Sequence, residues 1–77
     1  MKELLVNMME VWENNVIDAI EANREQFNFT LMPYDELKQE CLEAIKYYFD
    51  NEMIGIDFNY NNLVLDTAKS YNILREV

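Results

Sequence analysis

Residues 5–19 read LVNMMEVWENNVIDA, with an apolar side chain at every third or fourth position. The steps between these positions are four, three, four and three residues, which is the spacing of a helix face that packs against another helix. The positions are Leu5, Met9, Trp12, Val16 and Ala19. The pattern predicts a helix over about residues 3–26, in which Met8 and Ile20 widen the apolar face and Ala22 continues it. One helix cannot bury so broad a face alone, so further elements must cover it.

A second amphipathic pattern begins at Pro33, whose missing N–H suits the first turn of a helix. Asp35 and Glu36 follow, at positions where the helix dipole favours acidic side chains. The apolar positions again step by three and four residues: Tyr34, Leu37, Cys41, Ala44 and Tyr48. We therefore predict a helix over about residues 33–50. Residues 27–32 should connect the two helices, with apolar side chains folded beneath the connector.

Residues 51–77 fit two interpretations. In the first, a third helix covers about residues 60–71. Its buried face would consist of Val64, Ala68 and Tyr71. Asn72 would then adopt the left-handed conformation beyond the helix end, and Ile73 would close the hydrophobic contact there.

In the second interpretation, residues 54–66 contain a β-hairpin. Apolar side chains alternate along its first strand, at Ile54, Ile56, Phe58 and Tyr60. The two asparagines at 61–62 would form the turn, and Leu63 and Leu65 would return on the same face. An isolated hairpin is only marginally stable, so we favour the helix. The predicted fold is thus an all-α three-helix bundle in one domain over residues 1–77, and the alternative is an α+β fold of two helices and a C-terminal β-hairpin.

The composition argues against catalysis. The 77 residues include 15 acidic and 6 basic side chains, one Cys, one Gly and no His, and their formal net charge is -9. Catalysis near neutral pH commonly depends on His, on paired Cys residues or on a Gly-rich phosphate loop. Cys41 lies on a predicted buried face, where it has no His to activate it. We predict a protein with no enzymatic activity, no catalytic residue and no cofactor.

The sequence also argues against a metal site. Residues 50–61 place Gly55 at the sixth position of a calcium-binding loop. The rest of the loop pattern fails, because Ile54 occupies the fifth position and Asn61 stands where the twelfth requires Glu. Carboxylates from several helices can bind two metal ions, but such sites also use His, which this chain lacks. We predict no metal ligand.

Acidic side chains line the polar sides of both predicted helices. We predict that they bind a partner: Glu10, Glu13 and Glu21 on the first helix, and Glu36, Glu40, Glu43 and Asp50 on the second. Like charges one helical turn apart destabilise an isolated helix by about 0.2–0.5 kcal/mol per pair, which favours a role for them beyond solubility. Lys and Arg side chains on a basic protein surface complement these acids. The same charge disfavours direct binding to nucleic acid or to an anionic membrane.

The preferred function is therefore a non-enzymatic inhibitor or nucleic-acid-mimicking decoy that covers a basic surface of a nucleic-acid-handling protein. The size and acidity of the chain resemble those of small proteins that viruses and mobile elements use to block host enzymes. An antitoxin or immunity protein would use the same physics against another target. We expect a cytoplasmic protein, since the first residues lack a signal-peptide pattern and no segment reaches the roughly 20 apolar residues of a membrane span.

The alternative function is a helical assembly or adaptor protein. Met8, Val11 and Tyr47 lie beside or away from the predicted buried faces, and Met and aromatic side chains are enriched at protein interfaces. In this interpretation they form an apolar interface and the acidic side chains only keep the protein in solution. The resulting assembly would be a homodimer that persists at high salt. The salt dependence of binding therefore distinguishes the two hypotheses.

Overall fold

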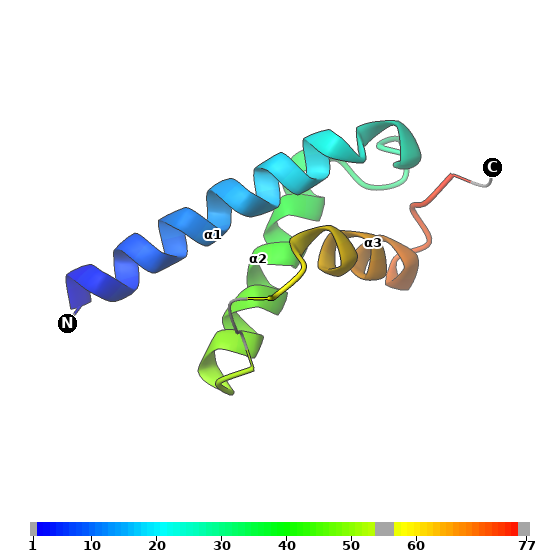
Figure 1. The fold of residues 1–77 in the computed structure, drawn as a ribbon. Coiled ribbons are helices and arrows are strands. Elements are labelled where there is room, and N and C mark those ends of the chain that lie inside the picture. The colour runs from blue at the N-terminus through cyan, green and yellow to red at the C-terminus, as the bar shows by residue number, and fades with distance from the viewer. Residues whose placement is uncertain (1, 54–56, 76–77) are drawn as a thin grey trace.

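Three α-helices make up most of the computed structural model, which describes residues 2–53 and 57–75, with side chains from residue 6 onward (Figure 1). The helices are α1 (Lys2–Ala22), α2 (Tyr34–Asp50) and α3 (Tyr60–Ser70), and a short 3-10 helix (Arg24–Gln26) follows α1. The described residues form no strand, which confirms the predicted all-α fold. The alternative hairpin is wrong, because Leu63 and Leu65 of its predicted return strand lie inside α3. Ile54 and Ile56 of its other strand lie outside the described residues.

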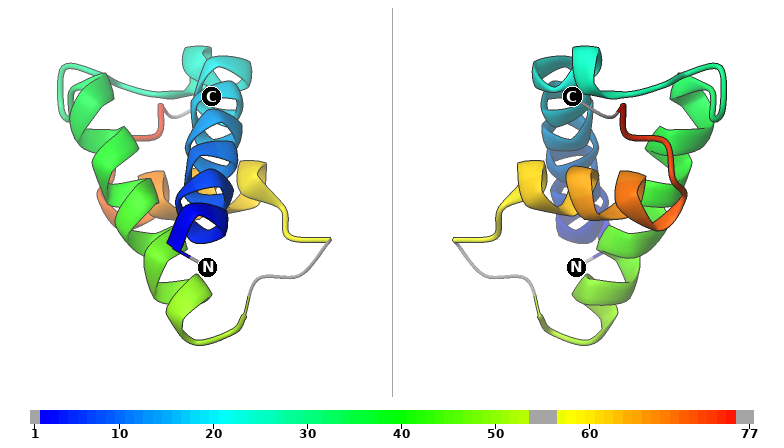
Figure 2. Two further views of the ribbon diagram at one scale, coloured as in Figure 1. Left: turned by 90° about the vertical axis from the view of Figure 1, so that its left-hand side faces the viewer. Right: turned by 90° about the vertical axis from the view of Figure 1, so that its right-hand side faces the viewer.

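Each helix contacts the other two. α3 lies across α1 and α2, so that the buried faces of all three helices meet at one centre (Figure 1 and Figure 2). α1 is the longest helix, and its N-terminal half extends beyond α3 at one end of the molecule (Figure 1). The molecule is accordingly elongated, with extents of 43 × 19 × 18 Å. None of the helices in the described ranges combines the length and the apolar composition that crossing a membrane requires.

Among the described residues, every buried side chain is apolar, and the predicted periodicity accounts for most of this core. The buried residues are Trp12, Val16, Ala19, Ile20, Phe27, Met32, Leu37, Cys41, Ile45, Leu63, Val64, Ala68 and Ile73. Full burial of a Val, Leu, Ile or Phe side chain contributes about 1.5–3 kcal/mol, so these contacts are the main source of stability. Ala22, which was predicted to continue the buried face of α1, is exposed.

α1 ends at Ala22, four residues before its predicted end. Asn23 interrupts it: the side-chain amide of Asn23 donates to the Ala19 carbonyl at 2.8 Å and to Asn61 Oδ1 of α3 at 3.2 Å. Asn side chains compete with backbone groups in this way and so favour helix ends. The chain then tightens into the 3-10 helix, which brings Phe27 into the core.

α2 and α3 end in the same kind of turn, in which the residue after the cap adopts a left-handed conformation. At the end of α3, Asn72 has a φ of 57°, and the N–H of Ile73 donates to the Ala68 carbonyl at 3.0 Å. Ile73 is buried, so the predicted end of this helix is confirmed. At the end of α2, Glu52 has a φ of 56°, and the N–H of Met53 donates back into the helix at 2.8 Å. Glu is less favourable than Gly in this conformation, because its Cβ crowds the backbone.

Two residues at helix ends differ from the prediction. Pro33 is extended, with a φ of -60° and a ψ of 153°, so it caps α2 from outside and the helix begins at Tyr34. Tyr71 was predicted on the buried face of α3 but is 47% exposed, because Ile73 fills the core position beyond the helix end. The Tyr71 ring reaches α2 instead, where its hydroxyl group donates to Glu40.

The connector between α1 and α2 folds beneath the helices only in part. Phe27 and Met32 are buried, as predicted, whereas Leu31 is exposed. Asn28 stabilises the bend between them, because its side-chain carbonyl accepts a hydrogen bond from the N–H of Thr30 at 3.2 Å.

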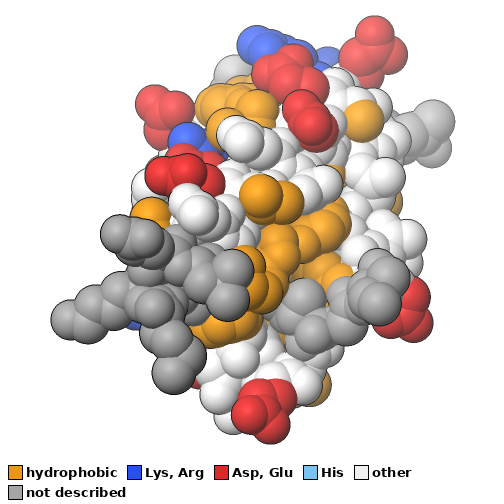
Figure 3. Space-filling model, turned by 60° about the vertical axis from the view of Figure 1, so that its left-hand side comes forward, with side chains coloured by type: hydrophobic (Ala, Val, Ile, Leu, Met, Phe, Trp, Pro, Cys, Tyr) orange, Lys and Arg blue, Asp and Glu red, His pale blue; other side chains and the backbone are white. Residues whose placement is uncertain are grey.

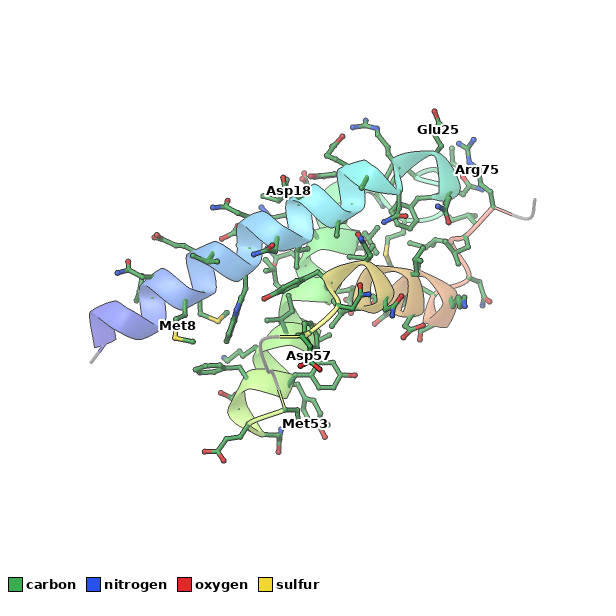
Figure 4. All side chains as sticks on the ribbon, in the orientation of Figure 1. Met8, Asp18, Glu25, Met53, Asp57 and Arg75 are labelled. Atoms are coloured by element: carbon green, nitrogen blue, oxygen red, sulfur yellow. The ribbon has the colours of Figure 1, made fainter. Side chains whose placement is uncertain are left out.

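The C-terminal segment lies beside this connector (Figure 2). An isolated antiparallel bridge joins Phe27 to Leu74, and the N–H of Asn28 donates to the Ile73 carbonyl at 2.7 Å. The guanidinium of Arg75 donates from Nε to the Phe27 carbonyl at 3.1 Å (Figure 4 labels Arg75). These bonds fix the end of α3 against the end of α1, and so position α3 across α2.

Candidate partner-binding surfaces

Three of the predicted acidic residues come together on one surface of α2. Glu36, Glu40 and Glu43 lie near Tyr71, whose hydroxyl group donates to Glu40 Oε2 at 2.5 Å. This hydrogen bond is the main reason why the pKa of Tyr71 is raised, and burial and the charges of all three carboxylates raise it further. We call these four residues the acidic face. Asp50, which was also predicted, is exposed at the last position of α2 and lies outside this group.

Within the part of the chain whose side chains are described, no salt bridge reaches a carboxylate of the acidic face. The two salt bridges found there join Arg24 to Glu21 and Lys38 to Glu13, each at 3.0 Å. The acidic face therefore presents uncompensated negative charge to solvent, and a cationic group is the ligand that it would attract.

The predicted acidic residues of α1 are arranged differently. Glu13 pairs with Lys38 of α2, so its charge is used to join two helices. The pKa of Lys38 is raised mainly by this hydrogen bond with Glu13. Glu21 pairs with Arg24, three residues along the chain. Glu10 is exposed, and it is the one member of the predicted α1 set that forms no salt bridge among the described side chains.

A groove between α2 and α3 adjoins the acidic face. Its first hollow has a volume of about 370 Å³ and is lined in part by Tyr48, Phe58 and Asp66. A second hollow is lined in part by Glu40, Glu43 and Tyr71. The two hollows have three lining residues in common, namely Ala44, Thr67 and Ser70. They therefore adjoin each other, and we call the two together the α2–α3 groove.

Aromatic rings form one end of this groove. The ring centroids of Tyr48 and Phe58 are 5.9 Å apart, and the rings are tilted by 57° to each other. Phe58 also contacts Tyr60, which lines the neighbouring hollow between α1 and α3, with an edge-to-face geometry and ring centroids 5.1 Å apart. All three rings are only partly buried, so part of their surface remains open to solvent. The groove thus combines aromatic surface with carboxylates.

The three predicted apolar contact residues are exposed, as expected: Met8 by 37%, Val11 by 57% and Tyr47 by 62%. Met8 and Val11 lie on the N-terminal half of α1, where Val6 is exposed as well. Figure 4 shows Met8 on the side of α1 that faces the end of α2. Figure 3 shows a continuous hydrophobic band on this side of the molecule. Met8 and Val11, three residues apart on α1, make up the second candidate surface, whereas Tyr47 is exposed on α2.

Cys41 is fully buried. Burial raises the pKa of its thiol to about 11, a hydrogen bond with Thr67 opposes the rise, and the charge of Glu40 adds to it. The thiol is therefore neutral at pH 7, and reactivity of a Cys depends on its thiolate. No group of three or more His, Cys, Asp or Glu residues in the described ranges could hold a metal ion. The predicted mismatch at Ile54 and Gly55 lies outside the described residues.

Sequence reasoning missed the contribution of α3 to the candidate site. Asp66 and Tyr71 join the groove and the acidic face only because α3 lies across α2. Phe58 was considered only as a strand residue, although its ring lies against Tyr48. A helical reading of residues 60–71 places Asp66 on its polar side, but nothing in the sequence shows which helix that side meets.

No model of a known protein family, no curated protein and no solved structure matches this chain.

Proposed function

We propose that this protein is a non-enzymatic interaction module that inhibits a nucleic-acid-handling protein by covering its basic surface. The acidic face would make the central contacts, through Glu36, Glu40 and Glu43. One observation carries the proposal: these three carboxylates share a surface on which no described Lys or Arg pairs with them. A surface of this kind would compete with the phosphates that the target normally binds.

The physics of the whole molecule supports the same interpretation. A formal net charge of -9 on 77 residues produces a field that accelerates encounter with a basic partner at low salt. Charges on Glu10, Glu21 and Asp50 would add to this field. Screening acts over about 8 Å at physiological ionic strength, so binding should weaken as salt is added.

A pull-down with the tagged full-length chain tests the proposal, with elution by a salt gradient and identification by mass spectrometry. The decisive variant is Glu36→Lys with Glu43→Lys, which spares the Glu40 carboxylate that accepts from Tyr71. Its matched control reverses two exposed acids elsewhere, Asp18→Lys with Glu25→Lys (Figure 4). We expect a nucleic-acid-binding protein to elute at moderate salt from wild type and control, and to be lost from the variant. Equal capture by all three proteins would refute the proposal.

A second candidate function is self-assembly through the apolar surface of α1. It is supported by the exposure of Met8 and Val11, three residues apart on the N-terminal half of α1. This candidate predicts a dimer that persists at high salt in light scattering. Met8→Asp should dissociate it, whereas Leu31→Asp, at an exposed apolar residue of the connector, should not. A monomer at all concentrations would exclude this candidate.

A further inference from the structure

The charged side chains that line the α2–α3 groove all have the same sign. Every charged side chain that lines its two hollows is acidic: Glu40, Glu43 and Asp66. Lys69 belongs to α3 but does not line either hollow. An occupant with negative charge, such as a nucleic acid or an anionic lipid headgroup, would therefore meet only repulsion there. Charge complementarity selects a cationic occupant.

The aromatic end of the groove narrows the choice of cation. Tyr48 and Phe58 lie against each other at 5.9 Å, and both line the hollow that also contains Asp66. A cation over the face of an aromatic ring is attracted by the ring electrons. The guanidinium of Arg is planar, stacks on aromatic faces and can donate two parallel hydrogen bonds to one carboxylate, which an ammonium group cannot do. The combination of two rings and one carboxylate therefore favours Arg.

The other end of the groove offers carboxylates for a second cation. Glu40 and Glu43 line this hollow together with Tyr71, whose hydroxyl group holds Glu40 in place. Ala44, Thr67 and Ser70 line both hollows, so the two ends of the groove meet at small side chains. One continuous segment of a partner could occupy both.

We propose that the α2–α3 groove binds a single basic segment of a partner protein, with an Arg side chain beside Tyr48, Phe58 and Asp66 and a second cationic side chain on Glu40 and Glu43. This inference rests on the proposed function and specifies the chemistry that the partner must offer. It adds specific contacts in the groove to the contact that Glu36 makes on the adjoining acidic face, while the other acidic side chains act through their long-range field.

The neighbouring hollow between α1 and α3 provides a matched control. It also has two acidic lining residues, Asp18 and Asp57 (Figure 4 labels both), and it shares Phe58 and Asn59 with the first hollow of the groove. It contains none of the acidic face, and this difference is what the control tests. The groove variant is Glu43→Gln with Asp66→Asn, and the control is Asp18→Asn with Asp57→Asn. Each removes two negative charges from exposed side chains, so long-range attraction falls equally.

The experiment is a titration of the isotope-labelled full-length chain with short peptides, followed by nuclear magnetic resonance. The probes are a peptide with several Arg residues, the same peptide with Lys in their place, and the same peptide with Glu. We expect saturable shifts of backbone amides along the facing sides of α2 and α3, with the Arg peptide binding tighter than the Lys peptide. The groove variant should lower the affinity for the Arg peptide about tenfold, since a hydrogen bond to a charged group contributes roughly 1.5–3 kcal/mol. The control should lower this affinity far less.

Each other outcome overturns a defined part of the account. If both variants weaken binding of the Arg peptide equally and the shifts spread over α1 and α2, the groove is not the binding site. The proposal that the protein binds a basic partner would still stand. Stronger weakening by the control would move the site to the α1–α3 hollow and refute the groove. No binding of either basic peptide at low salt would refute the groove and the proposed function together.

The aromatic contribution has its own variant, Tyr48→Leu, which removes a ring but keeps an apolar side chain. Its thermal unfolding curve shows whether the fold survives. In a folded variant, we expect the preference for Arg over Lys to disappear while the effect of Glu43→Gln persists. An unchanged preference would refute the role of the ring.

Discussion

α1 and α2 both carry acidic side chains along their polar sides, but the structure uses them differently. On α1, Glu13 and Glu21 are paired with Lys38 and Arg24. On α2, the carboxylates of the acidic face have the Tyr71 hydroxyl group as their neighbour and no described cation. The number of acidic side chains on a helix therefore does not measure the charge available for binding. Tertiary packing determines which carboxylates are paired with a cation and which remain available.

α2 is followed by an unfavourable turn that α1 lacks. The chain passes through a left-handed Glu52 just beyond α2, where Gly would be more favourable. Both helices carry acids at helical spacing, but on α2 three of them, Glu36, Glu40 and Glu43, follow one another without a described salt bridge. Proteins often keep such local costs where a surface is used for function. This is the physical reason for proposing that α2, and not α1, makes the central contacts.

The largest expected effect comes from charge reversal on the two helices. Against the captured partner, Glu36→Lys with Glu43→Lys should weaken binding about 100-fold, since close charge pairs at interfaces contribute at least about 1.5 kcal/mol each. Glu10→Lys with Glu21→Lys should weaken it only several-fold, through the long-range field. Titration calorimetry measures both. Equal losses on the two helices would remove the distinction drawn between them.

The next effect concerns stability. Glu52→Gly should stabilise the fold by up to about 1 kcal/mol, because Gly adopts the left-handed conformation without steric cost. Asn72→Gly should give less, because Asn already tolerates this conformation. Urea unfolding followed by circular dichroism measures both changes. A destabilised Glu52→Gly protein would show that the Glu52 side chain makes a contact that outweighs its backbone cost.

A smaller effect is the titration of Tyr71. Its pKa is raised, first by the hydrogen bond with Glu40, and burial raises the pKa of Tyr60 as well, so absorbance at alkaline pH should show two tyrosines that ionise later than a free tyrosine. The neutral hydroxyl group stabilises the fold below the unfolded pKa of about 10, and this contribution disappears as pH rises through the raised folded pKa. Glu40→Gln should lower the pKa of Tyr71 toward its usual value. If Glu40→Gln leaves the titration unchanged, Tyr71 does not report the acidic face.

The smallest expected effect is that of the pair between α1 and α2. A double-mutant cycle with Glu13→Gln and Lys38→Met should give a small coupling, because both side chains are half-buried and still reach solvent, where ion pairs contribute little and are screened by salt. Calorimetric melting of the four proteins measures it. A large coupling energy would contradict this expectation. It would show that the main role of Glu13 is to stabilise the contact between α1 and α2.

The helices themselves could be predicted from the sequence, because apolar periodicity is a local property. The alternation through Trp12, Val16 and Ala19 identified the buried side of α1, and Asn72 followed by Ile73 identified the end of α3. The end of α1 was missed, since Asn23 stops the helix partly through a bond to Asn61, which is distant in sequence.

The candidate site could be predicted only in part, for the same reason. The spacing of Glu36, Glu40 and Glu43 places them on one side of a helix, and this was recognised. The pairing of Glu13 with Lys38 and the approach of Tyr71 depend on how the helices cross, which no local pattern specifies. The groove is likewise a product of packing between α2 and α3.

The most direct test of the central claim is the affinity for the captured partner across a range of salt, measured by calorimetry on the wild-type chain. The account predicts that Kd rises at least tenfold between about 50 and 300 mM NaCl, because screening reaches the carboxylates of the acidic face. An affinity that stays constant over this range would contradict it and would assign the interaction to the apolar surface of α1.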